Sequence, residues 1–200
     1  MDFNALVKFI KSQGCKVIIY KNKERVNGAI GEFGEEPPRI NIATKGHEKK
    51  FIISTLLHEY AHFLQWEDGF SKYIDGICWS YDIHYEWMKG IRELTDSEKR
   101  MARNCMLALE YDAELRSYDL GTELKVEGFD ADFHLQEASC YMAHLKWSWA
   151  GRKDWHKRLS ASFWEPAKLT HEELFAPLTD RENIYLKGVR AKKKCSKKIP

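Results

Sequence analysis

The sequence predicts an α+β fold in which a small, mostly antiparallel sheet packs against one apolar helix, with additional helices towards the C-terminus. Three observations predict it. Short segments with β-branched or alternating apolar residues occupy positions 15–43, and an apolar run without Pro or Gly occupies positions 51–66. Helical periodicity then returns after residue 95.

One helix and three strands are expected before the apolar run. Asp2 can cap a first helix, and Gly14 fits its end. Residues 15–20 and 26–33 are predicted strands, and residues 39–43 form a third strand directly after two prolines. Because proline cannot donate to a strand ladder, the third strand or its neighbour is expected at an edge of the sheet.

The apolar run contains the pattern H-E-x-x-H, formed by His58, Glu59 and His62. On a helix the two histidines lie one turn apart on the same face, so both rings can share a tetrahedral zinc ion. Glu59 lies about 100° further round the helix and can act as a general base towards water. The alternative is two core histidines that only pack, but the long apolar helix and a suitable downstream acid favour a metal site.

The third zinc ligand predicted from the sequence is Glu110. It belongs to a helix that is expected to begin at the capping box Thr95-Asp-Ser-Glu98 and to stop near Gly121. Glu114 follows one turn later and can hold the N–H of one zinc histidine. The alternative is that both acids are solvated helix surface. Rival ligands are Asp112, His84, Glu86, His134 and His144.

These residues resemble the ImmA/IrrE type of gluzincin metallopeptidase over roughly residues 15–120. The resemblance rests on Pro38-Arg-Ile-Asn-Ile-Ala43, on the HEYAH sequence of the motif helix, and on Glu110-Tyr-Asp-Ala-Glu114. Position 114 departs from the family, which usually has Asn there. The resemblance implies a zincin-like fold and a zinc-dependent metallopeptidase that cleaves a protein or peptide substrate. It also implies that His58, His62 and Glu110 bind Zn²⁺ and that Glu59 is the general base.

The segment 67–95 between the motif and Glu110 is rich in aromatic residues. It can wall a substrate site or pack the helices together. Tyr81, His84 and Tyr85 are the candidates for a donor to the developing oxyanion, and the sequence does not choose among them. A sheet edge at residues 28–34 or 41–44 could hold an extended peptide substrate; the alternative is an ordinary sheet edge blunted by prolines.

The composition favours one packed domain over residues 1–200, because 44% of the chain is hydrophobic. Its core is expected over about 1–120, a helical extension over about 121–185 and a basic tail over about 186–200. No apolar run approaches the roughly 20 residues that a bilayer-spanning helix needs, and the N-terminus lacks a signal peptide pattern. The cytoplasm is therefore the expected compartment. Five cysteines without a C-x-x-C pattern indicate reduced thiols.

Two alternative functions follow from the remaining features. The first is a catalytically inactive zincin-fold binding protein, such as a phage or mobile-element factor. The second is a protease recruited to nucleic acid, because tryptophans alternate with basic residues between positions 146 and 164. A helix is predicted over residues 129–149, and a second capping box begins at Thr170.

Overall fold

A computed structural model describes residues 1–69 and 77–149, without the side chains at 77–81, 139–140, 143–144 and 146–148. The helical extension beyond residue 149, the Thr170 capping box, the tryptophan-rich basic segment from Trp155 and the basic tail lie outside the described residues. The chain divides into two compact units: Met1–Gly69 with Ala113–Leu135, and Phe70–Asp112 with Gln136–Pro200. The prediction of a single domain stays a prediction.

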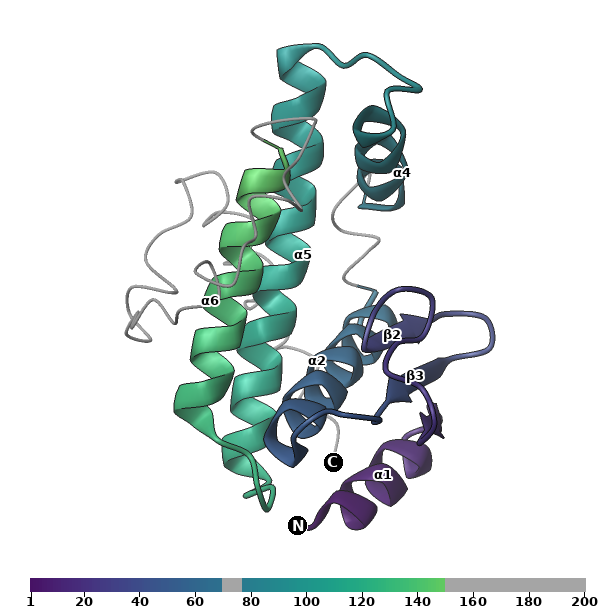
Figure 1. The fold of residues 1–200 in the computed structure, drawn as a ribbon, viewed down its shortest axis with the longest axis vertical. Helices are drawn as coiled ribbons and strands as arrows, with labels where there is room; N and C mark the ends of the chain where they lie inside the picture. Colours follow the sequence, from purple (N-terminus) through teal and green to yellow (C-terminus); the bar gives the residue numbers. More distant parts are fainter. Residues whose placement is uncertain (70–76, 150–200) are drawn as a thin grey trace. The chain divides into compact units, whose positions relative to one another are not determined.

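The first unit opens with helix α1 (Phe3–Ser12) and strand β1 (Lys16–Tyr20), followed by β2 (Gly31–Gly34) and β3 (Arg39–Ala43) (Figure 1). The Asp2 carboxylate accepts a hydrogen bond of 2.8 Å from the Ala5 amide, which caps α1 as predicted. Gly14 follows the helix at a φ of 94°, a conformation that favours glycine. The predicted first helix and third strand are therefore confirmed.

The sheet has the strand order β1-β3-β2. Strand β2 pairs antiparallel with β3, but β1 pairs parallel with β3, so the prediction of a mostly antiparallel sheet was wrong. The reason is the chain between β1 and β3, which is long enough to cross over and includes β2 itself. Strand β3 is central, so residues 41–43 do not lie at an edge of the sheet. Strand β2 does lie at an edge, so of the two segments predicted for an extended peptide only residues 28–34 remain candidates.

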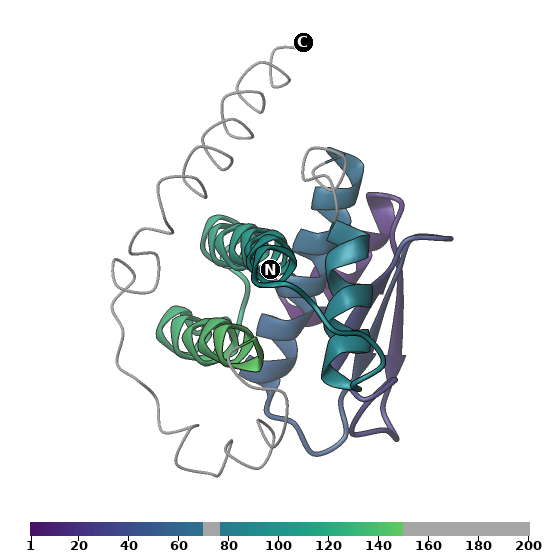
Figure 2. The same cartoon turned by 90° about the horizontal axis from the view of Figure 1, so that it is seen from above.

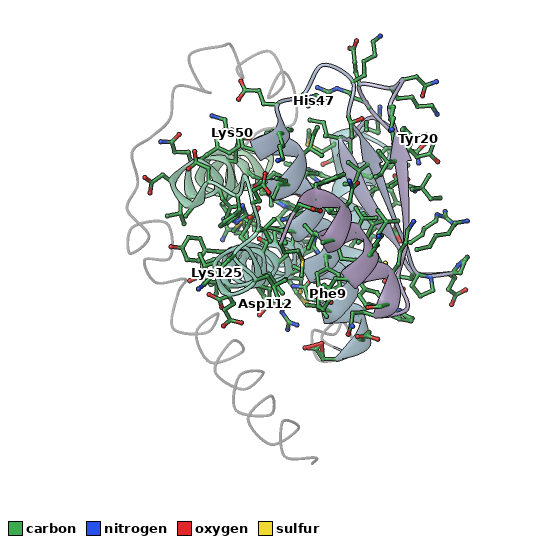
Figure 3. The ribbon with its side chains drawn as sticks, turned by 90° about the horizontal axis from the view of Figure 1, so that it is seen from below. Phe9, Tyr20, His47, Lys50, Asp112 and Lys125 are labelled. Atoms are coloured by element: carbon green, nitrogen blue, oxygen red, sulfur yellow. The ribbon has the colours of Figure 1, made fainter. Side chains whose placement is uncertain are left out.

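Helix α2 (Lys49–Glu67) carries the H-E-x-x-H pattern and packs with α1 against one face of the sheet (Figure 2). Ile40 and Ile42 of β3 are fully buried in this core, and each contributes about 1.5–3 kcal/mol by leaving water. Phe9 of α1 is labelled in Figure 3. Its ring meets that of Tyr60 of α2 edge to face, with ring centroids 6.0 Å apart. The sheet therefore supports the helix that bears the motif.

Helix α5 (Asp96–Glu123) is one unbroken helix, and α6 (Ala131–Ser148) follows it (Figure 1). Helix α5 ends at Glu123, close to the predicted stop near Gly121, but this glycine lies inside the helix and not after it. A Cβ atom there would come within 2.5 Å of the Phe129 ring, so Gly121 makes room for close packing. The Asp130 carboxylate accepts from the Phe133 amide at 3.0 Å and caps α6.

The second unit contains α4 (Ile77–Met88), which the sequence did not predict as a helix. Trp87 of α4 stacks on Trp149, with ring centroids 5.6 Å apart. The capping box is confirmed: the Glu98 carboxylate accepts from the Thr95 amide at 2.8 Å, and the Thr95 hydroxyl accepts from the Glu98 amide at 3.2 Å. Among the described helices, none has the length and apolar character that crossing a membrane requires.

Candidate metal centre

His58 and His62 lie one turn apart on α2, and their rings face each other. The ring centroids are 4.6 Å apart with an interplanar angle of 89°, and the two Nε2 atoms are 3.1 Å apart. This is the geometry that the spacing of four residues requires on a helix. The Nε2 atoms of both side chains therefore point to the same small region.

The other ring nitrogen of His62 fixes its tautomer. Nδ1 lies 2.8 Å from Oε1 of Gln65, a buried side chain one turn further along α2. Because an amide oxygen only accepts hydrogen bonds, Nδ1 of His62 carries the proton and donates it. In the neutral ring, Nε2 then has a lone pair in place of a proton.

The Nδ1 atom of His58 has a close contact with Glu114 of α5, without the alignment of a hydrogen bond. Oε1 of this carboxylate lies 3.1 Å from Nδ1 of His58, and Glu114 is buried. An ionised carboxylate is also only an acceptor, so the contact favours the proton on Nδ1 and the lone pair on Nε2. Two lone pairs at 3.1 Å repel unless a cation or a shared proton lies between them.

Glu110 completes a group that could hold a metal ion. One ligand atom each from His58, His62 and Glu110 lies within 4.8 Å of the others. Glu110 is buried and stands one turn before Glu114 on the unbroken helix α5. Two imidazoles and one carboxylate are the ligand set of catalytic zinc sites, and two nitrogens of a tetrahedral zinc are about 3.3 Å apart. The residues therefore fit a zinc ion.

The rival ligands do not join this group. Among the side chains that the structure describes, Asp112, His84, Glu86 and His134 are not part of any set of three or more metal-binding groups. The side chain of His144 lies outside the described ones. The chemistry of the site is therefore that of His58, His62 and Glu110.

Glu59 is buried on α2 and lies against strand β2. An ideal Cβ atom on Gly31 would be 2.9 Å from Cγ and 3.0 Å from Oε1 of Glu59, and 2.5 Å from Cγ2 of Thr55. Gly31 therefore lets the edge strand approach the acid closely. The Glu59 carboxylate lies between the motif helix and the edge of the sheet.

Sequence reasoning missed the role of His134 of α6, which is 1% exposed. Its Nδ1 lies 2.6 Å from the Ser54 hydroxyl, and its Nε2 lies 3.1 Å from the Ser117 hydroxyl and 3.3 Å from Oε2 of Glu114. Burial lowers the pKa of His134 below its ordinary value, and the negative charge of Glu114 opposes this only in part. Ser54 lies one turn before His58 on α2, but nothing in the sequence around it indicates a contact with His134.

The candidate oxyanion donors belong to the second unit. His84 packs against Trp149, with ring centroids 4.4 Å apart, and Tyr85 is 61% exposed. The side chain of Tyr81 lies outside the described ones. The role of these three residues stays a prediction.

No family model matches the chain, and neither the curated proteins nor the solved structures include a significant match. The resemblance to the ImmA/IrrE family therefore rests on the residues quoted above. The chemistry of the His58, His62 and Glu110 group is the remaining evidence for function.

Proposed function

We propose that this chain is a zinc-dependent metallopeptidase of gluzincin type with a zincin-like fold. The observation that carries the proposal is the pair of Nε2 atoms of His58 and His62, which face each other at 3.1 Å while both Nδ1 atoms face acceptors. A divalent cation removes the repulsion between these lone pairs. Glu110 supplies the negative charge that such a cation attracts.

Each residue has a separate task in this proposal. His58, His62 and Glu110 would hold Zn²⁺, which supplies a Lewis acid that makes water more acidic and polarises a carbonyl group. Glu59 takes the proton from the attacking water and passes it to the leaving amine. Its buried position beside Gly31 keeps the carboxylate out of bulk water, where proton transfer is less well directed.

The edge strand gives a place for an extended substrate. Strand β2 has one antiparallel neighbour, β3, and Gly31 in β2 adjoins the Glu59 carboxylate. A peptide that adds to this edge gains ladder hydrogen bonds, and its backbone passes beside the general base. The substrate is accordingly a protein or peptide with an accessible extended segment.

Cleavage of a peptide library tests the proposal. Zinc-supplied wild type and Glu59→Gln are incubated with peptides from a digested proteome, and new termini are identified by mass spectrometry. Since loss of general base catalysis costs about 10²–10⁴-fold in rate, cleavage by wild type should nearly vanish in Glu59→Gln. The amide keeps the size of the side chain, and zinc content should not change.

Cleavage that persists in Glu59→Gln would contradict the proposed mechanism. No cleavage by zinc-loaded wild type, even of unfolded proteins and peptides of varied sequence, would contradict the peptidase assignment. In that case the binding-protein alternative becomes the better account of the same metal centre.

A further inference from the structure

A buried polar network connects α6 to the histidines of α2. It contains Ser54 from α2, Glu114 and Ser117 from α5, and His134 from α6, all of which belong to the first unit and are buried. Such a network stabilises the fold only when each member has a suitable partner. The donor and the acceptor of each hydrogen bond follow from the partners of each atom, because a hydroxyl has only one proton to donate.

The Ser117 hydroxyl donates to the carbonyl oxygen of Glu114 at 2.9 Å. With its one proton committed there, its oxygen can only accept from Nε2 of His134 at 3.1 Å. Oε2 of Glu114, at 3.3 Å from the same nitrogen, is likewise an acceptor. Nε2 of His134 therefore carries the ring proton.

The second nitrogen of His134 then has a lone pair. Because burial lowers the pKa of His134 and disfavours the charged ring, the ring is neutral and Nδ1 accepts from the Ser54 hydroxyl at 2.6 Å. Ser54 is the residue one turn before His58 on α2. The two serines thus hold the imidazole with Nε2 beside Glu114, at 3.5 Å from its backbone carbonyl oxygen and 3.3 Å from its carboxylate oxygen Oε2.

Glu114 receives contacts from a histidine on each side. Oε2 faces Nε2 of His134 at 3.3 Å, and Oε1 faces Nδ1 of His58 at 3.1 Å. We propose that His134 is a positioning residue of the metal centre, which orients the Glu114 carboxylate so that it holds the Nδ1 proton of His58 and keeps the His58 Nε2 lone pair aimed at the metal. This inference rests on the proposed function.

The physical reason lies in the burial of Glu114. A buried carboxylate needs donors, and a neutral imidazole supplies one without adding a second positive charge next to the metal. If the donor is removed, the carboxylate can rotate, and His58 loses its fixed tautomer. Partners that hold metal-binding histidines in this way change metal affinity by about 10- to 100-fold.

Zinc affinity measured by competition with a chromophoric chelator tests the inference. His134→Phe keeps an aromatic ring but removes the donor, so zinc should bind about 10- to 100-fold more weakly. His134→Gln places an amide N–H near the same point and should recover most of that loss. Leu135→Ala is the matched control, because it removes a buried apolar side chain next to His134 on α6 and keeps Ser54, Glu114, Ser117 and His134, and it should bind zinc as wild type does.

The outcomes separate the inference from the proposed function. If wild type binds zinc and folded His134→Phe binds it equally well, the inference is wrong and the metal centre stands. If wild type binds no zinc, both are wrong. If His134→Phe does not fold, nitrogen NMR of the wild-type imidazoles decides. A neutral His134 with its proton on Nε2 supports the inference, and a proton on Nδ1 overturns it.

Discussion

His58 and His134 flank the same carboxylate, Glu114, but they use the imidazole in opposite ways. His134 faces hydroxyl or carboxylate oxygens at both ring nitrogens and is almost fully buried. His58 faces Glu114 at Nδ1, and its Nε2 points to Nε2 of His62. The surroundings of His134 provide a hydrogen-bond partner for both of its ring nitrogens. The surroundings of His58 and His62 instead direct the Nε2 lone pairs of both rings to one place.

Two histidines of one fold are thus given different tasks by their surroundings. Burial and two serine hydroxyls make His134 a fixed neutral donor, because the charged form would be desolvated. In His58 and His62, by contrast, the acceptors at Nδ1 favour the proton on that nitrogen. The Nε2 lone pairs therefore stay available to bind a cation. We therefore expect substitution of His134 to reduce stability, and substitution of His58 or His62 to affect chiefly metal binding.

The largest stability effect is expected for His134→Ala. The substitution leaves Ser54, Ser117 and Glu114 without their shared partner in a buried site, so the free energy of unfolding should fall by about 2–4 kcal/mol. Urea denaturation of the zinc-free protein measures it. His62→Ala, studied in the same way, should change stability much less, and an equal loss in both variants would remove the distinction between the two environments.

A smaller effect is expected for Gly31→Ala in the edge strand. The added methyl group would meet Thr55 and Glu59, and overpacking of this kind costs about 1–3 kcal/mol. Gly34→Ala is the matched control in the same strand, since the atoms nearest to its methyl group would belong to Arg39, at an ordinary 3.6 Å or more. Thermal denaturation should show a clear loss for the first variant and little change for the second.

The smallest effect is the dependence of stability on pH through His134. The pKa of His134 is lowered in the folded protein, so the unfolded chain, with an ordinary value of about 6.5, binds the proton first as pH falls. Stability is thus retained above pH of about 6.5 and declines below it, by at most about 1.4 kcal/mol per pH unit.

Urea denaturation at pH 7.5 and 5.5 measures this dependence in zinc-free wild type and His134→Gln. Because the titratable groups that act on the pKa of His134 are Glu114 and His58, both of which the variant keeps, the difference between the two proteins isolates His134. The variant should lose less stability on acidification. An identical decline in both would show that His134 does not carry the effect.

Local signals in the sequence predicted the elements that local chemistry determines. The Asp2 cap, the capping box at Thr95 and the one-turn spacing of His58 and His62 all depend on residues within four positions of each other. Their geometry follows from the backbone of a helix. These parts of the fold and of the site could therefore be predicted.

Features that depend on distant contacts could not be predicted. Ser54 and His134 are 80 residues apart, and nothing in either segment indicates the other. Gly121 has the sequence signature of a helix stop, but the Phe129 ring requires a glycine there for packing. The parallel pairing of β1 with β3 likewise depends on the path of the connecting chain.

Zinc content per chain, measured by elemental analysis, tests the central claim most directly. Wild type, His58→Ala, Glu110→Ala and His84→Ala are purified side by side with zinc supplied. We expect about one zinc per chain in wild type and in His84→Ala, and a strong loss in His58→Ala and Glu110→Ala. Absence of zinc from wild type, or its retention in Glu110→Ala with loss in His84→Ala, would contradict the proposed metal centre.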